Sequence, residues 1–337
     1  MLRKSDPIVN RILPILLAAV ICVMLCGRIS DSAPVSSAEV VSSHAFSLTT
    51  TTSLHSETTL LETADTTWGD MVTAGLLFDV THQRILFSKN ADQPIYPASL
   101  TKLLTPCVAL QYVSADTVFS VGSELTLLHA DSSLCYIRKG HRLTLYDLIS
   151  GMLMVSGNDA AYTIAVNVTR QMYPEKTLTD RQALEQFCKQ MNRFAADIGM
   201  KNSYFTNPDG WDDKEQYTTV HDLLTLALYA QNVPEIAEIT QAASRRVIFA
   251  SGQSITWKNT NLLLDKNSPY YYPFATGMKT GTTDLAGKCL LASAARNGQT
   301  LLVIGMGCDT EQKRYAFATQ LFDSVWGTFP SKTTSIG

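Results

Sequence analysis

A serine stands three residues before a lysine in the segment Pro97-Ala98-Ser99-Leu100-Thr101-Lys102. Positions i and i+3 lie on one face of a helix, so the Ser99 hydroxyl can meet the Lys102 amine there, as a nucleophile beside a base. Proline is favoured in the first turn of a helix, and apolar residues recur at helical spacing from Leu100 to Leu110. We therefore expect Ser99 at a helix N-terminus, where free backbone N–H groups can stabilise an oxyanion.

The Ser-x-x-Lys spacing alone is weak evidence, because it arises by chance roughly once in 250 positions. By itself it also fits a serine at a helix start followed by a solvated lysine. Two further motifs follow along the chain, Ser156-Gly157-Asn158 and Lys279-Thr280-Gly281. Alone, the Ser156 and Asn158 motif also fits a polar turn at the end of a helix, and Lys279 also fits a solvated strand end. Together the three motifs supply the groups that acyl transfer to a serine needs.

A lysine can act as a base only when it is neutral, and an ordinary lysine is protonated at neutral pH. The pKa of Lys102 must therefore fall by about 3 units, through burial and a second nearby cation. We expect Lys279 to be that cation. With the hydroxyls of Thr280 and Thr283, Lys279 is also suited to hold a carboxylate of the substrate.

Composition narrows the class of partner. The chain has 337 residues, 45% of them hydrophobic, and a formal net charge of −3. This is enough apolar material for one large core or two domains, and it provides no basic field for nucleic acid. We therefore expect a small-molecule or peptide substrate and no nucleic-acid partner. The six histidines are scattered, without His-x-x-x-His or Cys-x-x-Cys spacing, so we expect no metal site and no other cofactor.

The N-terminal part of the chain reads as an export segment. Three basic residues precede an apolar run from Ile12 to about Leu25, a pattern that fits a cleaved signal peptide or a retained membrane anchor over residues 1–29. Either alternative exports the rest of the chain. About half of residues 30–67 are Ser or Thr, which predicts a disordered linker. We expect one catalytic domain over residues 68–337.

Five of the seven cysteines lie outside the leader, an odd number that fits no complete disulfide set. Cys289 and Cys308 flank an expected hairpin. They face each other only if the turn is Gly298-Gln299, whereas a turn at Asn297-Gly298 makes them diagonal. We favour buried thiols.

The apolar patterns predict an α/β chain with strands at both ends and helices between them. Thr144 with Asp147 and Thr219 with Asp222 are expected helix caps, and the segment from Asn207 to Gly210 is expected to be a structural turn. Strands at both ends of the chain with helices between them imply one sheet assembled from distant segments. The expected strands cover residues 74–80, 84–87, 288–295 and 300–307, and the expected helices cover residues 143–155, 184–197, 219–231 and 311–326.

The motifs resemble those of the penicillin-recognising serine enzymes, and most closely the low-molecular-mass penicillin-binding proteins that are D-alanyl-D-alanine carboxypeptidases. The resemblance covers residues 68–326. It implies a β-lactamase/transpeptidase-like fold, with a mainly antiparallel sheet flanked by helices and an all-helical subdomain. It is carried by the segments Pro97–Lys102, Ser156–Ala160, Asn207–Gly210, Gly277–Thr283 and Leu290–Ala294.

The resemblance also implies roles for the motif residues. Ser99 would attack the carbonyl of the penultimate D-alanine in a peptidoglycan stem peptide, with Lys102 as the base. Ser156 would pass a proton toward the leaving amine, and Asn158 would orient Lys102 and the substrate amide. The family pattern places the oxyanion between the backbone N–H groups of Ser99 and Thr282.

In the same pattern, Gly281 would leave the strand edge clear for an incoming peptide backbone. β-Lactams would acylate Ser99, and the setting would be the cell wall or the outer face of the cytoplasmic membrane.

Two other functions stay open. A class A β-lactamase needs a glutamate that activates the deacylating water, in a Glu-x-x-x-Asn element. Glu175 and Glu185 lie at suitable positions, but neither has Asn four residues later. A non-hydrolytic domain that senses β-lactams through an acylated Ser99 would need the same three motifs.

Overall fold

The computed structural model of the chain describes residues 68–327. The expected leader over residues 1–29 and linker over residues 30–67 lie outside the described residues. Within the described range, the helices are too short or too polar to cross a bilayer.

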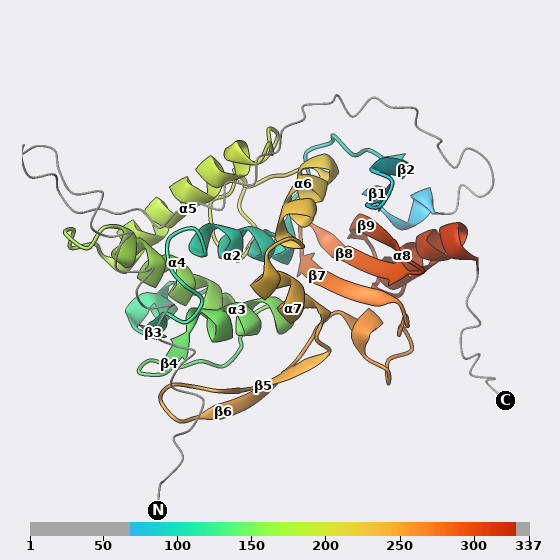
Figure 1. Ribbon diagram of the computed structural model, residues 1–337. Helices are drawn as coiled ribbons and strands as arrows, with labels where there is room; N and C mark the ends of the chain where they lie inside the picture. Colours follow the sequence, from blue (N-terminus) through green and yellow to red (C-terminus); the bar gives the residue numbers. More distant parts are fainter. Residues whose placement is uncertain (1–67, 328–337) are drawn as a thin grey trace, which may run out of the picture. The chain divides into compact units, whose positions relative to one another are not determined.

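Five antiparallel strands form the main sheet, in the order β2-β1-β9-β8-β7 (Figure 1). The two ends of the folded chain thus meet in one sheet, which confirms the expected assembly from distant segments. Strand β7 lies at one edge and carries the Lys-Thr-Gly motif. The strands are β1 (Ala74–Asp79), β2 (Arg84–Lys89), β7 (Ala275–Thr283), β8 (Gly287–Arg296) and β9 (Gln299–Cys308).

The hairpin between β8 and β9 turns at Asn297-Gly298, because Arg296 pairs with Gln299. Both turn residues have positive φ, 51° and 81°, as a type I′ turn requires. This is the register in which Cys289 and Cys308 are not opposite each other. Both are buried free thiols, so the expectation of thiols rather than a disulfide is confirmed.

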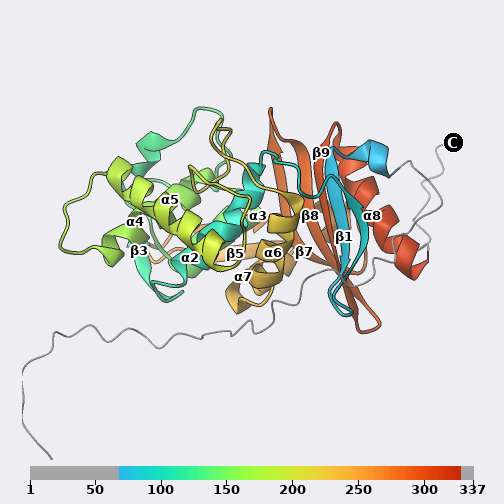
Figure 2. The same cartoon turned by 90° about the horizontal axis from the view of Figure 1, so that it is seen from above.

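Helices cover both faces of the sheet (Figure 2). Successive side chains of a strand point to opposite faces, and in β1 both faces are buried. Leu76 belongs to the core shared with the large helical part, and Leu77 to the core beneath the last helix. The helices are α2 (Leu104–Ala109), α3 (Leu145–Met154), α4 (Asn158–Met172), α5 (Asp180–Asp197), α6 (Val220–Ala230), α7 (Pro234–Gln241) and α8 (Glu311–Trp326).

Side-chain caps begin two of these helices, α3 and α6, where the sequence predicts them. Thr144 accepts a hydrogen bond from the backbone N–H of Asp147, and Thr219 accepts one from that of Asp222, both at 3.1 Å. The expected last helix matches the bounds of α8. Two short strand pairs contact the helices. The first is β3 (Val118–Ser120) with β4 (Arg142–Thr144), and the second is β5 (Ser244–Ile248) with β6 (Ser254–Lys258).

Helices α4 and α7 have no counterpart among the expected elements. Residues 158–166 of α4 are all buried, so this half of the helix shows no alternation between an apolar and a polar face. Its first residue, Asn158, is the last residue of the polar Ser-Gly-Asn motif, whose composition predicts a turn. Helix α7 has only eight residues, too few for a clear helical period.

Candidate active site

Ser99 lies in the second position of the 3-10 helix η3 (Ala98–Leu103), which continues into α2. The Lys102 amine donates a hydrogen bond to the Ser99 hydroxyl at 2.9 Å and another to the Asp209 carbonyl at 2.6 Å. The structure therefore brings serine and lysine together through the helical spacing read from the sequence. The tighter 3-10 geometry favours this contact, because residues i and i+3 eclipse each other there.

Burial is the main cause of the lowered basicity of Lys102. The side chain is fully buried, which lowers its pKa from 10.5 to about 8, while the negative charges of Asp209 and Asp159 partly oppose the change. The pKa of Lys279 is lowered well below 10.5 by burial, then by Lys102 and Arg314. Burial is thus the largest cause of the lowered pKa of each lysine, and Lys102 adds to the lowering at Lys279.

The Ser-Gly-Asn motif forms the turn from α3 into α4. Ser156 has a positive φ of 61°, a backbone conformation that is uncommon for residues other than glycine and is frequent at functional sites. Asn158 is the first residue of α4, and its backbone N–H donates to the Ser133 carbonyl at 2.7 Å. The next residue, Asp159, accepts hydrogen bonds from the backbone N–H groups of Cys135 and Ile137. These bonds fix the segment around Ser133 against the motif.

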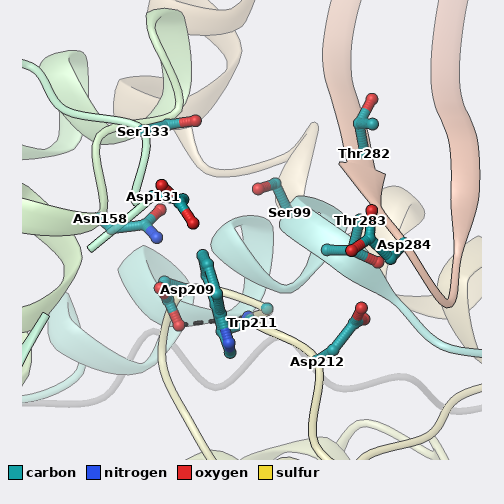
Figure 3. A pocket seen from close by; sticks show the side chains of 11 residues that line it. Ser99, Asp131, Ser133, Asn158, Asp209, Trp211, Asp212, Thr282, Thr283 and Asp284 are labelled. Carbon is teal, nitrogen blue, oxygen red and sulfur yellow. Dashed lines mark hydrogen bonds between the residues drawn. The ribbon is translucent and has the colours of Figure 1, made fainter. Parts of the chain in front are cut away.

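Two pockets open beside Ser99. The first, here called the acidic pocket, has a volume of about 490 Å³ and is lined by Ser99, Asp131, Ser133, Asn158, Asp209, Gly210, Trp211, Asp212, Thr282, Thr283 and Asp284 (Figure 3). The second, here called the Arg314 pocket, has a volume of about 360 Å³ and is lined by Ser99, Ser133, Val155, Ser156, Thr260, Leu262, Thr280, Gly281, Thr282, Glu311 and Arg314. Ser99 therefore lies where the two pockets meet.

The Lys-Thr-Gly residues lie along β7, where Thr280 and Gly281 line the Arg314 pocket, but Lys279 itself lines neither pocket. Its side chain is 1% exposed, and its amine donates to the Thr280 carbonyl at 2.8 Å. The Thr280 hydroxyl bonds the Thr260 hydroxyl at 2.7 Å, and the Thr283 hydroxyl accepts from the Ala286 backbone N–H at 3.1 Å. The motif is thus present as expected, with its cation behind the strand surface.

Arg314 supplies a cation that the sequence did not reveal. Its side chain is buried, and one guanidinium nitrogen lies 3.4 Å from the Gly281 carbonyl and 3.4 Å from the Thr282 hydroxyl. A second nitrogen bonds Glu311 at 3.0 Å. In the sequence, Glu311 and Arg314 form an ordinary i,i+3 pair of a helix surface, so nothing local distinguished this arginine.

The turn at Asn207–Gly210 contacts η3 and α2 close to Ser99. The Asp209 carbonyl binds Lys102, and the Pro208 carbonyl accepts a hydrogen bond from the Thr105 hydroxyl at 2.6 Å. The turn is therefore structural, as expected, and also contacts the proposed base directly. Among residues 68–327, no group of three or more His, Cys, Asp or Glu side chains is placed to hold a metal ion.

Glycines on both sides allow the close approach of η3. A Cβ atom on Gly281 would lie 3.0 Å from the Ala98 Cβ and 3.2 Å from the Ser99 nitrogen. Gly281 therefore clears space for the first residues of η3, in addition to the expected role of leaving the strand edge open. Strand β7 is indeed an edge strand of the sheet, which leaves that second role available.

The ordered motifs and their geometry agree with a comparison with known families. A family model described as D-alanyl-D-alanine carboxypeptidase, peptidase S11, matches residues 70–310. The chain belongs to this family. The resemblance read from the three motifs is thereby confirmed.

Curated members of the D-alanyl-D-alanine carboxypeptidase family show how far the similarity extends. The carboxypeptidase DacF of Bacillus subtilis (strain 168) is 26% identical over 249 residues, which cover 73% of this chain and 60% of the relative. The carboxypeptidase DacA of Haemophilus influenzae is 30% identical over 260 residues, which cover 75% of this chain and 60% of the relative. The chain thus spans about three-fifths of the length of these relatives.

Solved structures share the fold. The crystal structure of the Streptomyces K15 DD-transpeptidase matches with a TM-score of 0.69 and 25% identity, covering 77% of this chain and 98% of that one. The carboxypeptidase DacD of Francisella tularensis matches with a TM-score of 0.63 and 28% identity, covering 76% of this chain and 70% of that one. The expected fold, an antiparallel sheet flanked by helices, is confirmed.

For this member of the carboxypeptidase family, Gly210→Ala tests how closely the Asn207–Gly210 turn is fitted to η3. Gly210 has a φ of +83°, and a Cβ atom there would lie 1.8 Å from the Ala98 carbonyl oxygen. We expect the substitution to lower the free energy of unfolding by roughly 3 kcal/mol or more, because the backbone before Ser99 must move. Urea denaturation measures the loss.

Gly199→Ala is the matched control, because Gly199 also has a positive φ, +98°, but no atom lies within 4 Å of the added Cβ. It should cost only about 1–2 kcal/mol, the cost of the left-handed conformation. Equal losses for the two variants would contradict the close packing at Gly210.

Proposed function

We propose that the chain is a serine-type D-alanyl-D-alanine carboxypeptidase that removes the terminal D-alanine from peptidoglycan stem pentapeptides through an acyl-enzyme on Ser99, and that β-lactams acylate the same serine. The observation that carries the proposal is the 2.9 Å contact between Ser99 and the buried Lys102 at the junction of two pockets. Membership of the D-alanyl-D-alanine carboxypeptidase family supports it.

In the proposed acylation, neutral Lys102 takes the proton of the Ser99 hydroxyl while the oxygen attacks the carbonyl of the penultimate D-alanine. The backbone N–H groups of Ser99 and Thr282 stabilise the negative charge on the carbonyl oxygen. Ser156 passes a proton to the departing amine of the terminal D-alanine, and Asn158 orients the substrate amide. Water then hydrolyses the ester and restores the Ser99 hydroxyl.

The free carboxylate of the leaving D-alanine is proposed to lie in the Arg314 pocket, near the Thr280 hydroxyl and between two cations. Thr283, which was expected to share this role, lines the acidic pocket instead. Arg314 lines that pocket directly. Lys279 lies behind it with a lowered pKa, and a bound carboxylate would raise this pKa again by favouring the charged amine.

Mass spectrometry of a pentapeptide ending in D-Ala-D-Ala, incubated with the purified protein, tests the reaction. Loss of one alanine residue supports the carboxypeptidase, and transfer of the shortened peptide to an added amino acid would indicate a transpeptidase. An intact peptide together with lasting penicillin labelling of Ser99 would indicate the sensor. A cross-linked peptide dimer as substrate tests whether the protein is also an endopeptidase.

The β-lactamase alternative lacks its water-activating group. Neither Glu175 nor Glu185 lines the acidic pocket or the Arg314 pocket. The one glutamate lining these two pockets is Glu311, which pairs with Arg314 at 3.0 Å. We therefore expect slow release of a penicilloyl group, measured by the decay of labelled protein.

The proposed function places the catalytic domain, residues 68–337, outside the cytoplasm, where peptidoglycan is built and cell shape is maintained. Residues 1–29 would export it, as a cleaved signal peptide or as a retained anchor that associates with the membrane, and residues 30–67 would be the linker. Mass spectrometry of the mature N-terminus distinguishes the two leaders.

Comparing a substrate that has a free C-terminal carboxylate with its C-terminal amide tests whether Lys279 and Arg314 bind that carboxylate. Charge-assisted hydrogen bonds are worth roughly 1.5–3 kcal/mol, so wild type should favour the acid by about 10- to 150-fold in kcat/KM. Lys279→Ala and Arg314→Gln should each reduce this ratio. If the ratio stays at the wild-type value in Lys279→Ala, then Lys279 does not contribute to recognition of the carboxylate and Arg314 binds it. The role of Lys279 would then be limited to its hydrogen bond with the Thr280 carbonyl.

A further inference from the structure

Residues 133–137, here called the wall segment, lie on the side of the active site that faces strand β7. Ser133, the first of them, lines both pockets. Figure 3 shows Ser133 across the pocket from Thr282 and Thr283 of β7. A peptide backbone that lies along the edge of β7 must fit between that edge and the wall segment. The position of the wall segment therefore limits the space beside Ser99.

The wall segment belongs to no helix or strand, so its backbone groups need partners from elsewhere in the chain. The Asp159 carboxylate is 1% exposed and accepts hydrogen bonds from the backbone N–H groups of Cys135 at 2.9 Å and Ile137 at 3.1 Å. From the other side, the Trp257 indole N–H donates to the Cys135 carbonyl at 3.0 Å. Both backbone groups of Cys135 are thus held, one from α4 and one from β6.

Close packing holds the side chain of Cys135 as well, and this side chain is fully buried. A Cβ atom on Gly151 would lie 2.9 Å from the Cys135 Sγ and 3.1 Å from the Trp257 ring. A Cβ atom on Gly157 would lie 2.8 Å from the Cys135 Cβ. Helix α3, the Ser-Gly-Asn motif and β6 therefore hold Cys135 in place, two residues after Ser133.

We propose that Asp159 and Trp257 are positioning residues for the acylation of Ser99, because they hold the wall segment at Cys135 from two sides. Neither residue lines a pocket, so both act through the wall segment. The Ser133 carbonyl accepts from the Asn158 backbone N–H at 2.7 Å, which links the segment to the Ser-Gly-Asn motif. This inference rests on the proposed acylation of Ser99, and it gives the β5–β6 hairpin a function in catalysis.

Asp159→Asn tests the first hold. The amide replaces one acceptor oxygen with an NH₂ group that opposes a backbone N–H of the wall segment. We expect the rate constant of penicillin acylation at about pH 9.5, where most of Lys102 is neutral, to fall about 10- to 100-fold, since a small misplacement far from the reacting atoms is costly.

The pH profile of Asp159→Asn should change as well. The charged groups that face Lys102 are Asp159 on α4, Asp209 on the Asn207–Gly210 turn and Lys279 on β7. The negative charge of Asp159 raises the pKa of Lys102 against the larger effect of burial. Without this charge the apparent pKa should fall below about 8, so the loss of rate should be smaller at about pH 6.5 than at about pH 9.5.

Trp257→Phe tests the second hold without changing a charge. It removes the donor to the Cys135 carbonyl, so we expect acylation to slow about 2- to 10-fold with an unchanged apparent pKa. Because both residues act through the same segment, the double variant should lose less than the product of the two single losses. Stopped-flow measurement of penicillin acylation gives the rates and the apparent pKa values.

Asp222→Asn is the matched control, because Asp222 is 5% exposed and also holds a segment of backbone. Its carboxylate accepts from the Asn202 backbone N–H at 2.7 Å and from the Ser203 hydroxyl at 2.6 Å, and it lines neither pocket. This variant should keep the wild-type rate and apparent pKa, whatever loss of stability thermal melting shows.

An unchanged acylation rate in Asp159→Asn or in Trp257→Phe would overturn the inference, and so would an equal loss of rate in Asp222→Asn. If Asp159→Asn does not fold, Trp257→Phe against Asp222→Asn decides. Penicillin that acylates Ser99 while the pentapeptide keeps its terminal D-alanine would reject the carboxypeptidase and leave this test in force. A wild-type protein that reacts with neither would reject both proposals.

Discussion

Ser99→Ala is expected to abolish both the release of D-alanine and covalent labelling by penicillin, with a loss in kcat on the order of 10⁶-fold. The reason is that, among residues 68–327, the Ser99 hydroxyl is the one that is hydrogen-bonded to the Lys102 amine, which must accept its proton. The Ser99 oxygen is 2.9 Å from the Lys102 amine and lines both pockets. Gel fluorescence of protein labelled with a fluorescent penicillin measures the adduct, and reversed-phase analysis of the peptide measures turnover.

Ser133→Ala is the matched control for this experiment. Ser133 also lines both pockets, but no hydrogen bond links its hydroxyl to Lys102. This variant should still form the penicillin adduct, although its rate can change because Ser133 lies in the pocket wall. A labelled Ser99→Ala protein would contradict the assignment of the nucleophile, provided that thermal melting shows both variants to be folded.

Lys102→Ala is expected to slow acylation by about 10²- to 10⁴-fold, the usual contribution of a general base. Its pH dependence should change as well. The pKa of Lys102 is lowered to about 8, and only the neutral amine accepts the serine proton. The wild-type acylation rate should therefore rise with pH up to about 8, and below that value it should fall about tenfold for each pH unit.

The variant should lack this rise, because the group that titrates is gone. Lys139→Ala, at an exposed position, is the control and should keep the wild-type profile. Stopped-flow measurement of penicillin acylation between pH 6 and about 9.5 gives the apparent pKa. A profile in Lys102→Ala with the same rise as in wild type would assign the titration to another group, and an unchanged rate would show that Lys102 is not the base.

Sequence alone was sufficient for features that depend on residues close together in the chain. The Ser99–Lys102 contact follows from i,i+3 geometry, and the caps at Thr144 and Thr219 follow from hydrogen bonds to a backbone group three residues on. Strands β1, β2, β8 and β9 and helix α8 were also readable, because their apolar runs are bounded by turns or by a cap. Strand β7 was not among the expected strands. The three motifs together identified the family.

Tertiary structure decided the features that depend on distant contacts. The Lys102 amine binds the Asp209 carbonyl 107 residues away, and a backbone carbonyl leaves no mark in a sequence. Arg314 approaches Gly281 across 33 residues, although locally it is one half of a helix-surface pair. The fully buried first half of α4 hid its helical period for a similar reason, since its surroundings come from several other elements.

The lowered pKa of Lys102 shows the division most clearly. The sequence identified the lysine and predicted that burial and a second cation would lower its pKa, and in the structure burial is the main cause. Burial is a property of the whole packed core, to which η3, the Asn207–Gly210 turn and strand β7 all contribute. Local sequence specifies which groups are present and how neighbours in the chain meet, while their protonation and approach to a substrate depend on which distant segments exclude water from them.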